Sequence, residues 1–312
     1  MRILVTGAAG GLGSNVARAA AARGLEVRGL VRDAKRAPSI KGVEWVIGDA
    51  RDSGVVARAA GQCDALFHLV NVNLTADWVK TTAELLASAI GACKETGARL
   101  VFPANVWVFG RGRPGQRVSE DQAYAPCSTL GAARRVKEER IRDSGSRFVM
   151  VRLPEFYGPY VQTLTGPPLL KIAAGERATW FGPPDVDVEL VYMPDAAEAL
   201  LTIGLATGVD GETFHLPGAA AISPREFFAL ACDVAGGGGF RAIPPWLVKV
   251  AGLVSREART FADILHLWTD PILLDGTKVS ARFSQLKPTP YRDGLRTTLD
   301  WLRQNPSARM YY

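Results

Sequence analysis

A glycine-rich turn between an apolar strand and a helix is the strongest constraint that this sequence places on its fold. Residues 2–13 read RILVTGAAGGLG and lead directly into the alanine-rich segment SNVARAAAARG. Gly7, Gly10 and Gly13 permit a tight turn, a close approach of the backbone to a phosphate and close packing of the helix on the sheet. The helix start adds N–H donors and the positive end of a dipole. We therefore expect these three glycines to bind a nucleotide cofactor.

Apolar runs alternate with helical segments through the first half of the chain. Such alternation is typical of a parallel sheet with helices on both faces. The expected strands are RILVTG, LEVRGLVR, VEWVIGD, DALFHLV, ARLVFPANV, RFVMVRL and, later, ETFHLP. We predict an α/β fold, a doubly wound parallel-sheet Rossmann domain with a smaller, mostly helical C-terminal lobe.

The regular pattern loosens after Pro154, where segments rich in Pro and Gly begin. We predict a Rossmann domain of residues 1–153 plus about 190–217, and a substrate-binding lobe of about 154–189 plus 218–312. Ligands of such sheets lie at the carboxyl ends of the strands. The cleft between sheet and lobe is therefore the expected substrate site.

Composition narrows the class of protein. Hydrophobic residues make up 47% and charged residues 22%, and no apolar run approaches the roughly 20 residues that span a bilayer. No signal-peptide core is present, so we expect a cytoplasmic protein without a membrane partner. The net charge of +6 is spread along the chain, which does not favour a nucleic-acid partner.

The four cysteines show no metal or redox spacing, and we expect no bound metal. They are Cys63, Cys93, Cys127 and Cys232. Each is interpreted as a packing residue or a free thiol. A reactive thiol is an alternative for Cys127, which lies near the expected site.

The end of the second expected strand favours NADP over NAD. Arg32 stands where a carboxylate would bind an unphosphorylated ribose, and Lys35 and Arg36 follow closely. A guanidinium pairs instead with a 2′-phosphate. Asp33 leaves NAD possible, because a register error of one residue would place an acid at the decisive position.

Several segments together carry a family resemblance. TGAAGGLG, GDARD, FHLV, LVFPANVWVFG, RLPEFYGP and YMPDAAEAL resemble the extended short-chain dehydrogenase/reductases, also called the NAD-dependent epimerase/dehydratase family. The resemblance runs over nearly all of the chain and implies an NAD(P)-dependent enzyme acting on a small molecule. It also suggests a homodimer formed through the stretches 75–96 and 130–144, by analogy alone.

The resemblance assigns further residues to the cofactor. It implies that Asp49 contacts the adenine and that Leu69 and Val70 lie along the dinucleotide. Pro154, Glu155 and Phe156 would border the nicotinamide. Sheet packing is the alternative explanation for these residues.

The chain departs from the family pattern at the position of the usual proton-donating residue. Members place a Tyr and, four residues later, a Lys on one helix face, where the ammonium lowers the phenol pKa. The matching positions here are Leu130 and Arg134, and Asn105 replaces the usual Ser or Thr. Arg134 can orient a ribose as a permanent cation, and Asn105 can donate an amide hydrogen bond or satisfy a loop backbone.

A proton donor must therefore come from elsewhere, and Glu155 is the preferred candidate, since a carboxyl in an apolar cleft has a raised pKa. A salt bridge to Arg134 or Arg152 is its alternative role. The other candidates are Tyr157, Ser128, Thr129, Tyr124 and water. His68 and His215 are interpreted as core residues, and His266 as a residue that can face the cleft.

Three functions fit these observations. The first is an NADP-dependent oxidoreductase of a small organic substrate with a non-standard proton donor. The second is an epimerase, dehydratase or cyclase without net redox change. The third is a non-catalytic NADP-binding sensor.

Overall fold

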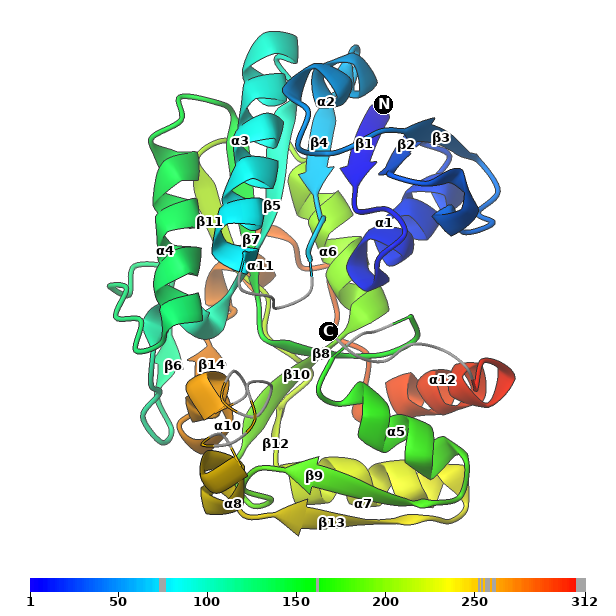
Figure 1. The fold of residues 1–312 in the computed structure, drawn as a ribbon, viewed down its shortest axis with the longest axis vertical. Helices are drawn as coiled ribbons and strands as arrows, with labels where there is room; N and C mark the ends of the chain where they lie inside the picture. Colours follow the sequence, from blue (N-terminus) through cyan, green and yellow to red (C-terminus); the bar gives the residue numbers. More distant parts are fainter. Residues whose placement is uncertain are drawn as a thin grey trace.

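The main sheet has the predicted parallel Rossmann topology. The computed structural model describes residues 1–72, 77–160, 163–251, 253, 255, 259 and 262–306. A seven-stranded sheet has the order β11-β7-β5-β4-β1-β2-β3, and each adjacent pair is parallel (Figure 1). The strands are β1 Arg2–Thr6, β2 Glu26–Val31, β3 Val43–Ile47, β4 Ala65–His68, β5 Arg99–Asn105, β7 Phe148–Leu153 and β11 Glu212–His215. All seven strands predicted from the sequence are confirmed.

Helices cover both faces of this sheet. One face carries α1 (Gly11–Ala22) and α6 (Met193–Gly204), and the other carries α2 (Ser53–Ala60), α3 (Trp78–Thr96) and α4 (Thr129–Arg142). Figure 1 shows the long α3 and α4 side by side.

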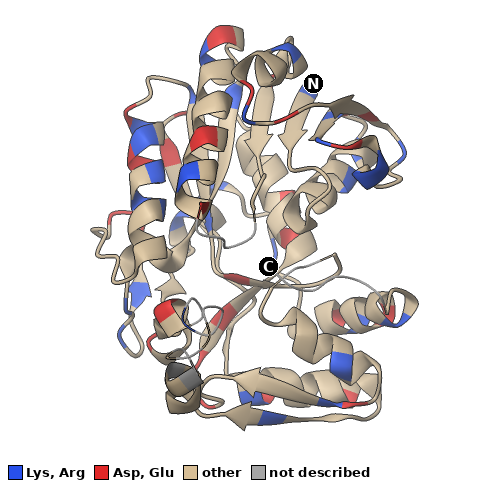
Figure 2. Ribbon diagram, viewed as in Figure 1, with Lys and Arg blue, Asp and Glu red and all other residues tan. Residues whose placement is uncertain are grey.

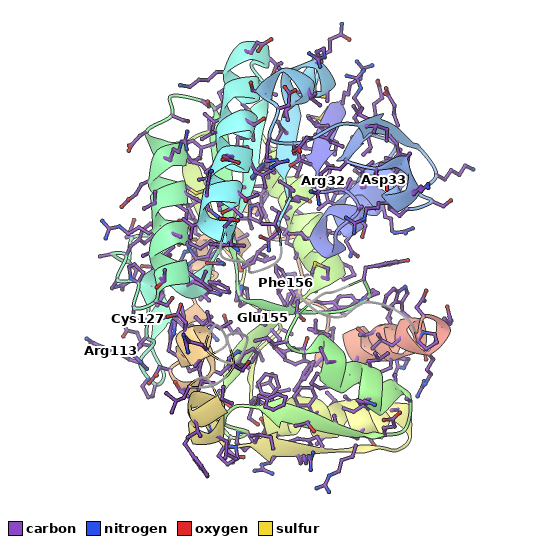
Figure 3. The ribbon with its side chains drawn as sticks, in the orientation of Figure 1. Arg32, Asp33, Arg113, Cys127, Glu155 and Phe156 are labelled. Carbon is purple, nitrogen blue, oxygen red and sulfur yellow. The ribbon has the colours of Figure 1, made fainter. Side chains whose placement is uncertain are left out.

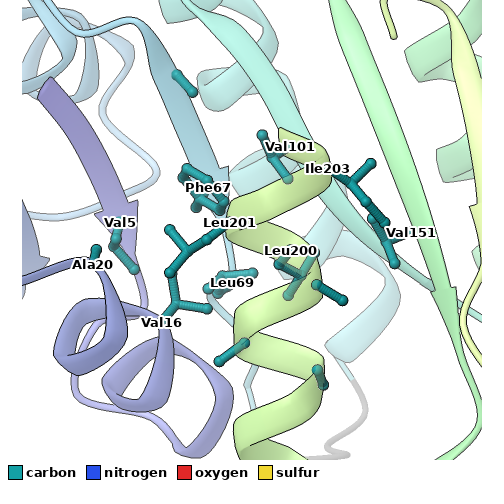
Figure 4. Close-up of a cluster of buried hydrophobic side chains, with 14 of the residues drawn as sticks. Val5, Val16, Ala20, Phe67, Leu69, Val101, Val151, Leu200, Leu201 and Ile203 are labelled. Atoms are coloured by element: carbon teal, nitrogen blue, oxygen red, sulfur yellow. The ribbon is translucent and has the colours of Figure 1, made fainter. Parts of the chain in front are cut away.

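The strands alternate between these two faces. Ile3 and Val5 pack with the α1 and α6 cluster, whereas Leu4 packs with the α2 and α3 cluster, and all three are fully buried. In the first cluster, Val16 of α1 and Leu200 of α6 meet side chains of the sheet (Figure 4). A strand buried on both faces requires an unbroken apolar run, which the sequence provides.

The C-terminal lobe contains short sheets as well as helices. Its strands are β8 Glu155–Tyr157, β10 Val188–Tyr192 and β12 Ala221–Ile222 in one sheet, and β9 Arg177–Phe181 with β13 Gly239–Ile243 in another. Its helices are α5 Gly166–Ala173, α7 Pro224–Ala235, α8 Pro245–Ala251, α10 His266–Thr269 and α12 Tyr291–Gln304. The lobe is mostly helical, as predicted, and its strands are short.

Two later segments return to the Rossmann domain. The helix α11 (Thr277–Arg282) contacts β11, and its Val279 belongs to the core cluster of the sheet. The strand β14 (Leu273–Leu274) pairs with β6 (Arg117–Val118). The helix α11 thus packs on the Rossmann sheet, although it lies within the 218–312 part of the predicted substrate-binding lobe.

A buried ion pair joins β7 to α4. Arg152 and Glu138 are each 1% exposed at their side chains, and Arg152 Nη2 donates to Glu138 Oε2 at 2.8 Å. Arg152 also donates to the Tyr124 hydroxyl at 2.9 Å, to His215 Nε2 at 3.3 Å and to the backbone carbonyl of Asn105. These contacts fix α4 against the carboxyl ends of β5, β7 and β11.

Replacing Arg152 with Met should lower the free energy of unfolding by about 3 to 5 kcal/mol, because it leaves the Glu138 carboxylate buried without its cation. Denaturant unfolding measures the loss. The control is Arg147→Met, which removes a 55%-exposed guanidinium paired with Asp210 and should cost below about 1 kcal/mol. Equal losses in the two variants would contradict a structural role for the buried pair.

Candidate active site

A cavity of about 290 Å³ lies at the carboxyl ends of the central strands. Its walls come from the glycine-rich turn after β1, the segment after β4, the end of β5, the helix α4 and the start of β8. This is the edge at which the sequence predicts the ligand of a doubly wound sheet. Charged residues of both signs are distributed over both parts of the molecule (Figure 2).

The three glycines of the turn have different physical roles. A Cβ on Gly13 would lie 2.1 Å from the Gly7 carbonyl oxygen, and a Cβ on Gly7 would lie 2.5 Å from Val70 Cα. Gly7 also has a φ of +72°. These two glycines are therefore required by packing alone, with or without a ligand.

Gly10 differs, because its added Cβ would meet only the Gly7 carbonyl oxygen, at 3.2 Å. It precedes α1, whose start has no side-chain hydrogen-bond cap. Gly7, Gly10, Gly11 and Leu12 line the cavity. Uncapped helix N–H groups beside a cavity suit a pyrophosphate.

Arg32, the residue expected at the 2′-phosphate of the cofactor, directly follows β2. Both Arg32 and Asp33 are exposed (Figure 3). The Asp33 carboxylate accepts a hydrogen bond from the Lys35 backbone N–H at 2.9 Å and caps a 3₁₀ turn, η1 (Ala34–Arg36). The Asp49 carboxylate is paired with Arg51 at 2.6 Å, which holds its pKa below the usual range. Both acids thus have local partners in this structure.

The predicted cofactor strip lies along the cavity. Leu69, Val70, Pro154 and Phe156 all belong to its lining. Leu69 also packs with the core cluster that contains Val5 and Phe67, so sheet packing and a cofactor contact are compatible for this residue.

Asn105 ends β5 and lines the cavity. Its amide oxygen accepts a hydrogen bond from the Trp107 backbone N–H at 3.1 Å and caps η2 (Val106–Phe109). The oxygen is therefore engaged locally, and the NH₂ group is the part of the side chain that a ligand oxygen can use. The structure shows the local role considered for Asn105, and donation of its NH₂ group to a ligand stays a prediction.

Arg134 lines the cavity from α4. Its guanidinium carbon lies 5.0 Å from the ring centroid of Trp78 and 5.5 Å from that of Trp107. Stacking between two indoles holds the planar cation in place.

Glu155 begins β8 and lines the same cavity (Figure 3). Its Oε1 atom is buried and has no hydrogen-bond partner among the described residues. Burial raises the pKa of the carboxyl to about 7, against a smaller lowering by the Phe156 backbone N–H. The salt bridge considered with Arg152 is not formed, because Arg152 pairs with Glu138.

Tyr157 does not share this position. It is 1% exposed and packs with Tyr192, Phe227 and Tyr291 at centroid distances of 5.3 to 5.7 Å in the core of the lobe. Its buried hydroxyl has no hydrogen-bond partner among the described residues, and burial raises its pKa. The structure therefore corrects Tyr157 from a proton-donor candidate to a core residue.

Tyr124 and Ser128 are also engaged. The Tyr124 hydroxyl belongs to the Arg152 network, and the Ser128 hydroxyl accepts from the Gly131 N–H at 3.0 Å as the cap of α4. Cys127 is an exposed free thiol, labelled in Figure 3. His215 is buried as expected, whereas the buried His266 is not in the cavity lining.

Two titratable residues line the cavity without having been predicted there, namely His68, which was expected to be a core residue and is buried, and Lys137. His68 ends β4 and lines the cavity although it is buried, and burial lowers its pKa to about 3, so its imidazole is neutral. Lys137 of α4 is 5% exposed and lines the cavity as well. A signal for Lys137 was present, because residues 134 and 137 share a helix face at spacing three.

The fold and this strand-end cavity define a Rossmann enzyme of the short-chain dehydrogenase/reductase class. The family model "NAD dependent epimerase/dehydratase family" matches residues 3–216. The chain belongs to this family and is an enzyme of the extended type. None of the helices in the described ranges is both long and apolar enough to cross a bilayer.

Similar proteins include two bacterial reductases. The 4-hydroxy-2-methyl-3-oxo-4-farnesyl-3,4-dihydroquinoline-1-oxide ketoreductase of Stigmatella aurantiaca is 25% identical over 76% of this chain and 74% of that protein. The 2-alkyl-3-oxoalkanoate reductase of Stenotrophomonas maltophilia is 29% identical over 72% of this chain and 73% of that protein.

Solved structures share the fold over the whole length. DesIV, a dTDP-glucose 4,6-dehydratase of Streptomyces venezuelae solved with NAD bound, has a TM-score of 0.78 and 22% identity, covering 98% of each chain.

Replacing Gly10 with Val should abolish binding of a dinucleotide, because the branched side chain would enter the space beside the uncapped start of α1. Calorimetric titration with NADPH measures this loss. The control is Gly91→Val in α3, where an added Cβ has nothing within 4 Å. Unchanged micromolar affinity in the Gly10 variant would exclude this turn as the phosphate site.

Proposed function

We propose that this enzyme is an NADP-dependent oxidoreductase that reduces the carbonyl group of a small organic substrate. The observation that carries the proposal is the Glu155 carboxyl, which lines the strand-end cavity with a buried oxygen that none of the described residues hydrogen-bonds and has a pKa of about 7. Such a group holds a proton near neutral pH and can donate it to a developing alkoxide. The names of the two reductases similar to this chain support carbonyl reduction.

The residues present fit a dinucleotide. Gly7, Gly10 and the uncapped start of α1 would hold the pyrophosphate, and Arg32 would hold the 2′-phosphate. Leu69, Val70, Pro154 and Phe156 would line the nicotinamide half, and Arg134 would orient its ribose. When bound, a reduced nicotinamide supplies the hydride.

Asn105 and Glu155 have different roles at the substrate carbonyl. The Asn105 NH₂ donates a hydrogen bond to the carbonyl oxygen and favours the negative charge that develops there. The protonated Glu155 carboxyl then transfers its proton to that oxygen. Arg134 contributes position and charge, because a guanidinium does not release its proton in this pH range.

A second, smaller cavity supports a small, largely apolar substrate. It has a volume of about 40 Å³ and shares Asn105, Trp107, Pro154 and Glu155 with the main cavity. The remaining lining comprises Val106, Leu153, Val188, Glu189, Leu267, Trp268, Pro271 and Ile272. The Glu189 carboxylate is engaged, since it accepts from Arg117 at 2.6 Å and from the Leu274 N–H at 2.9 Å.

NADP preference is tested by Arg32→Ala. We expect a loss of about 1 to 3 kcal/mol in NADPH binding, typical of a lost charged hydrogen bond, and little change for NADH. Titration of both cofactors measures the difference. The control is Arg36→Ala, at another exposed arginine of the same loop. Equal losses for NADPH and NADH would remove Arg32 from the phosphate site.

The proton donor is tested by Glu155→Gln. We expect kcat for carbonyl reduction to fall by about 100-fold or more, with cofactor affinity nearly unchanged. Since the donor is the protonated carboxyl, wild-type kcat/KM for reduction should decrease as pH rises through about 7, the pKa of Glu155.

The control for this variant is Glu176→Gln, which alters a 55%-exposed carboxylate paired with Lys171 in the lobe. Steady-state NADPH oxidation with a panel of small ketones and aldehydes provides the rates. Normal kinetics in the Glu155 variant would exclude this carboxyl as the donor. A lack of carbonyl reduction by the wild-type enzyme, despite tight NADPH binding, would favour the epimerase, dehydratase or sensor alternatives.

A further inference from the structure

Lys137 is a buried amine on the wall of the main cavity, and it has no part in the carbonyl reduction proposed for Asn105, Glu155 and Arg134. Its Nζ atom lies 4.1 Å from the centroid of the Trp78 ring, and the residue is 5% exposed. It follows Arg134 by three residues, so both basic side chains line the cavity from one side of α4.

No carboxylate neutralises this lysine in the described part of the chain. None of the ion pairs formed there includes Lys137. The two acidic neighbours on α4 are engaged elsewhere, Glu138 with Arg152 and Glu139 with Arg135. A buried ammonium without an anion is costly, and an anionic ligand in the cavity would offset that cost.

The charged and titratable groups around Lys137 come from three elements. Arg134 lies on α4, the neutral His68 ends β4, and Glu155 lines the same cavity from β8. Burial, and then the charge of Arg134, lower the pKa of Lys137 to about 6. The amine is therefore mostly uncharged at pH 7 when the cavity holds no anion.

Strand order places Lys137 at the nicotinamide half of the dinucleotide. Arg32 and Asp49 follow β2 and β3, the glycine-rich turn follows β1, and β4 and β5 come next across the sheet. A dinucleotide with its 2′-phosphate at Arg32 and its pyrophosphate at α1 therefore directs its other half toward β4, β5 and α4.

We propose that Lys137 binds the nicotinamide half of the cofactor, and that its protonation depends on the cofactor's redox state. The anionic reduced cofactor favours the ammonium form, so a proton is taken from solvent on binding. The oxidised ring carries a positive charge beside Lys137, so less of that proton is retained. This inference rests on the cofactor binding proposed above.

Proton uptake on binding tests the proposal without any catalytic readout. NADPH and NADP⁺ are titrated calorimetrically at pH 7 in buffers of different ionisation enthalpy, which gives the number of protons bound. The full-length Glu155→Gln variant is used, because Glu155 also titrates near pH 7. We expect net proton uptake on binding NADPH, at most about 0.9 proton per cofactor because a pKa of about 6 leaves about a tenth of the amine protonated at pH 7, and less uptake for NADP⁺.

Three further substitutions in this background identify the group that takes up the proton. Lys137→Met and Lys137→Arg should both abolish the uptake. The first removes the amine, and the second replaces it with a cation that stays protonated. The arginine variant should retain affinity for NADPH. The control, Lys80→Met, makes the same change at an exposed position of α3 and should retain the uptake. Circular dichroism verifies that each variant is folded.

The outcomes separate the two proposals. Proton uptake that persists in both Lys137 variants overturns the role of Lys137. The same holds if NADPH binds to the Glu155→Gln protein without any proton uptake. Both results leave the proposed function intact. Equal uptake for NADPH and NADP⁺ overturns the dependence on redox state. A wild-type protein that binds neither cofactor overturns the proposed function itself, and this inference with it.

Discussion

The geometry of the candidate site depends on the buried Arg152 guanidinium. It donates to the Asn105 carbonyl, to the Glu138 carboxylate and to the Tyr124 hydroxyl, and these partners come from β5, α4 and the segment between them. Asn105 itself lines the cavity, and α4 also carries Arg134 and Lys137. One cation thus sets the distance between the strand end and the helix that form opposite parts of the site.

The carboxyls of Glu138 and Glu155 differ in their partners more than in their burial. Glu138 is buried and held by Arg152, so its charge is compensated. Glu155 is only two residues beyond the end of β7, yet its Oε1 has no described partner and its pKa is raised to about 7. Because Glu138 uses the cation of Arg152, that arginine does not hold Glu155 as a carboxylate. The structural ion pair therefore leaves the second carboxyl in the protonation range that acid catalysis needs.

Sequence reasoning succeeded where local pattern determines structure. The seven strands are mostly apolar runs, of which the central ones β1, β4, β5 and β7 are the most buried, and the glycines at 7, 10 and 13 mark the turn from the local sequence alone. It failed where the position of a side chain or helix is determined by packing against residues far away in the sequence. Tyr157 lies two residues after Glu155, but Phe227 and Tyr291, far along the chain, enclose its ring. The helix α11 likewise returns to β11 through Val279, which no motif indicates. Lys137 was not predicted because the family motif marks only positions 130 and 134 of α4.

The two cations of α4 show how a departure from the family pattern changes the chemistry available to the cavity. Arg134 stacks on Trp78 and Trp107 and carries a fixed charge, which positions a ligand without exchanging protons. Lys137, one turn further along, shares the Trp78 face but can lose its proton when buried. In the usual Tyr and Lys pair the charge and the proton belong to neighbouring groups on one helix face. Here the charge stays at 134, a titratable amine lies at 137, and the carboxyl that can reach a substrate oxygen comes from β8. In the proposed mechanism the acid–base function lies on groups whose pKa values are set by burial in the cavity, so we expect occupancy of the cavity to control their protonation.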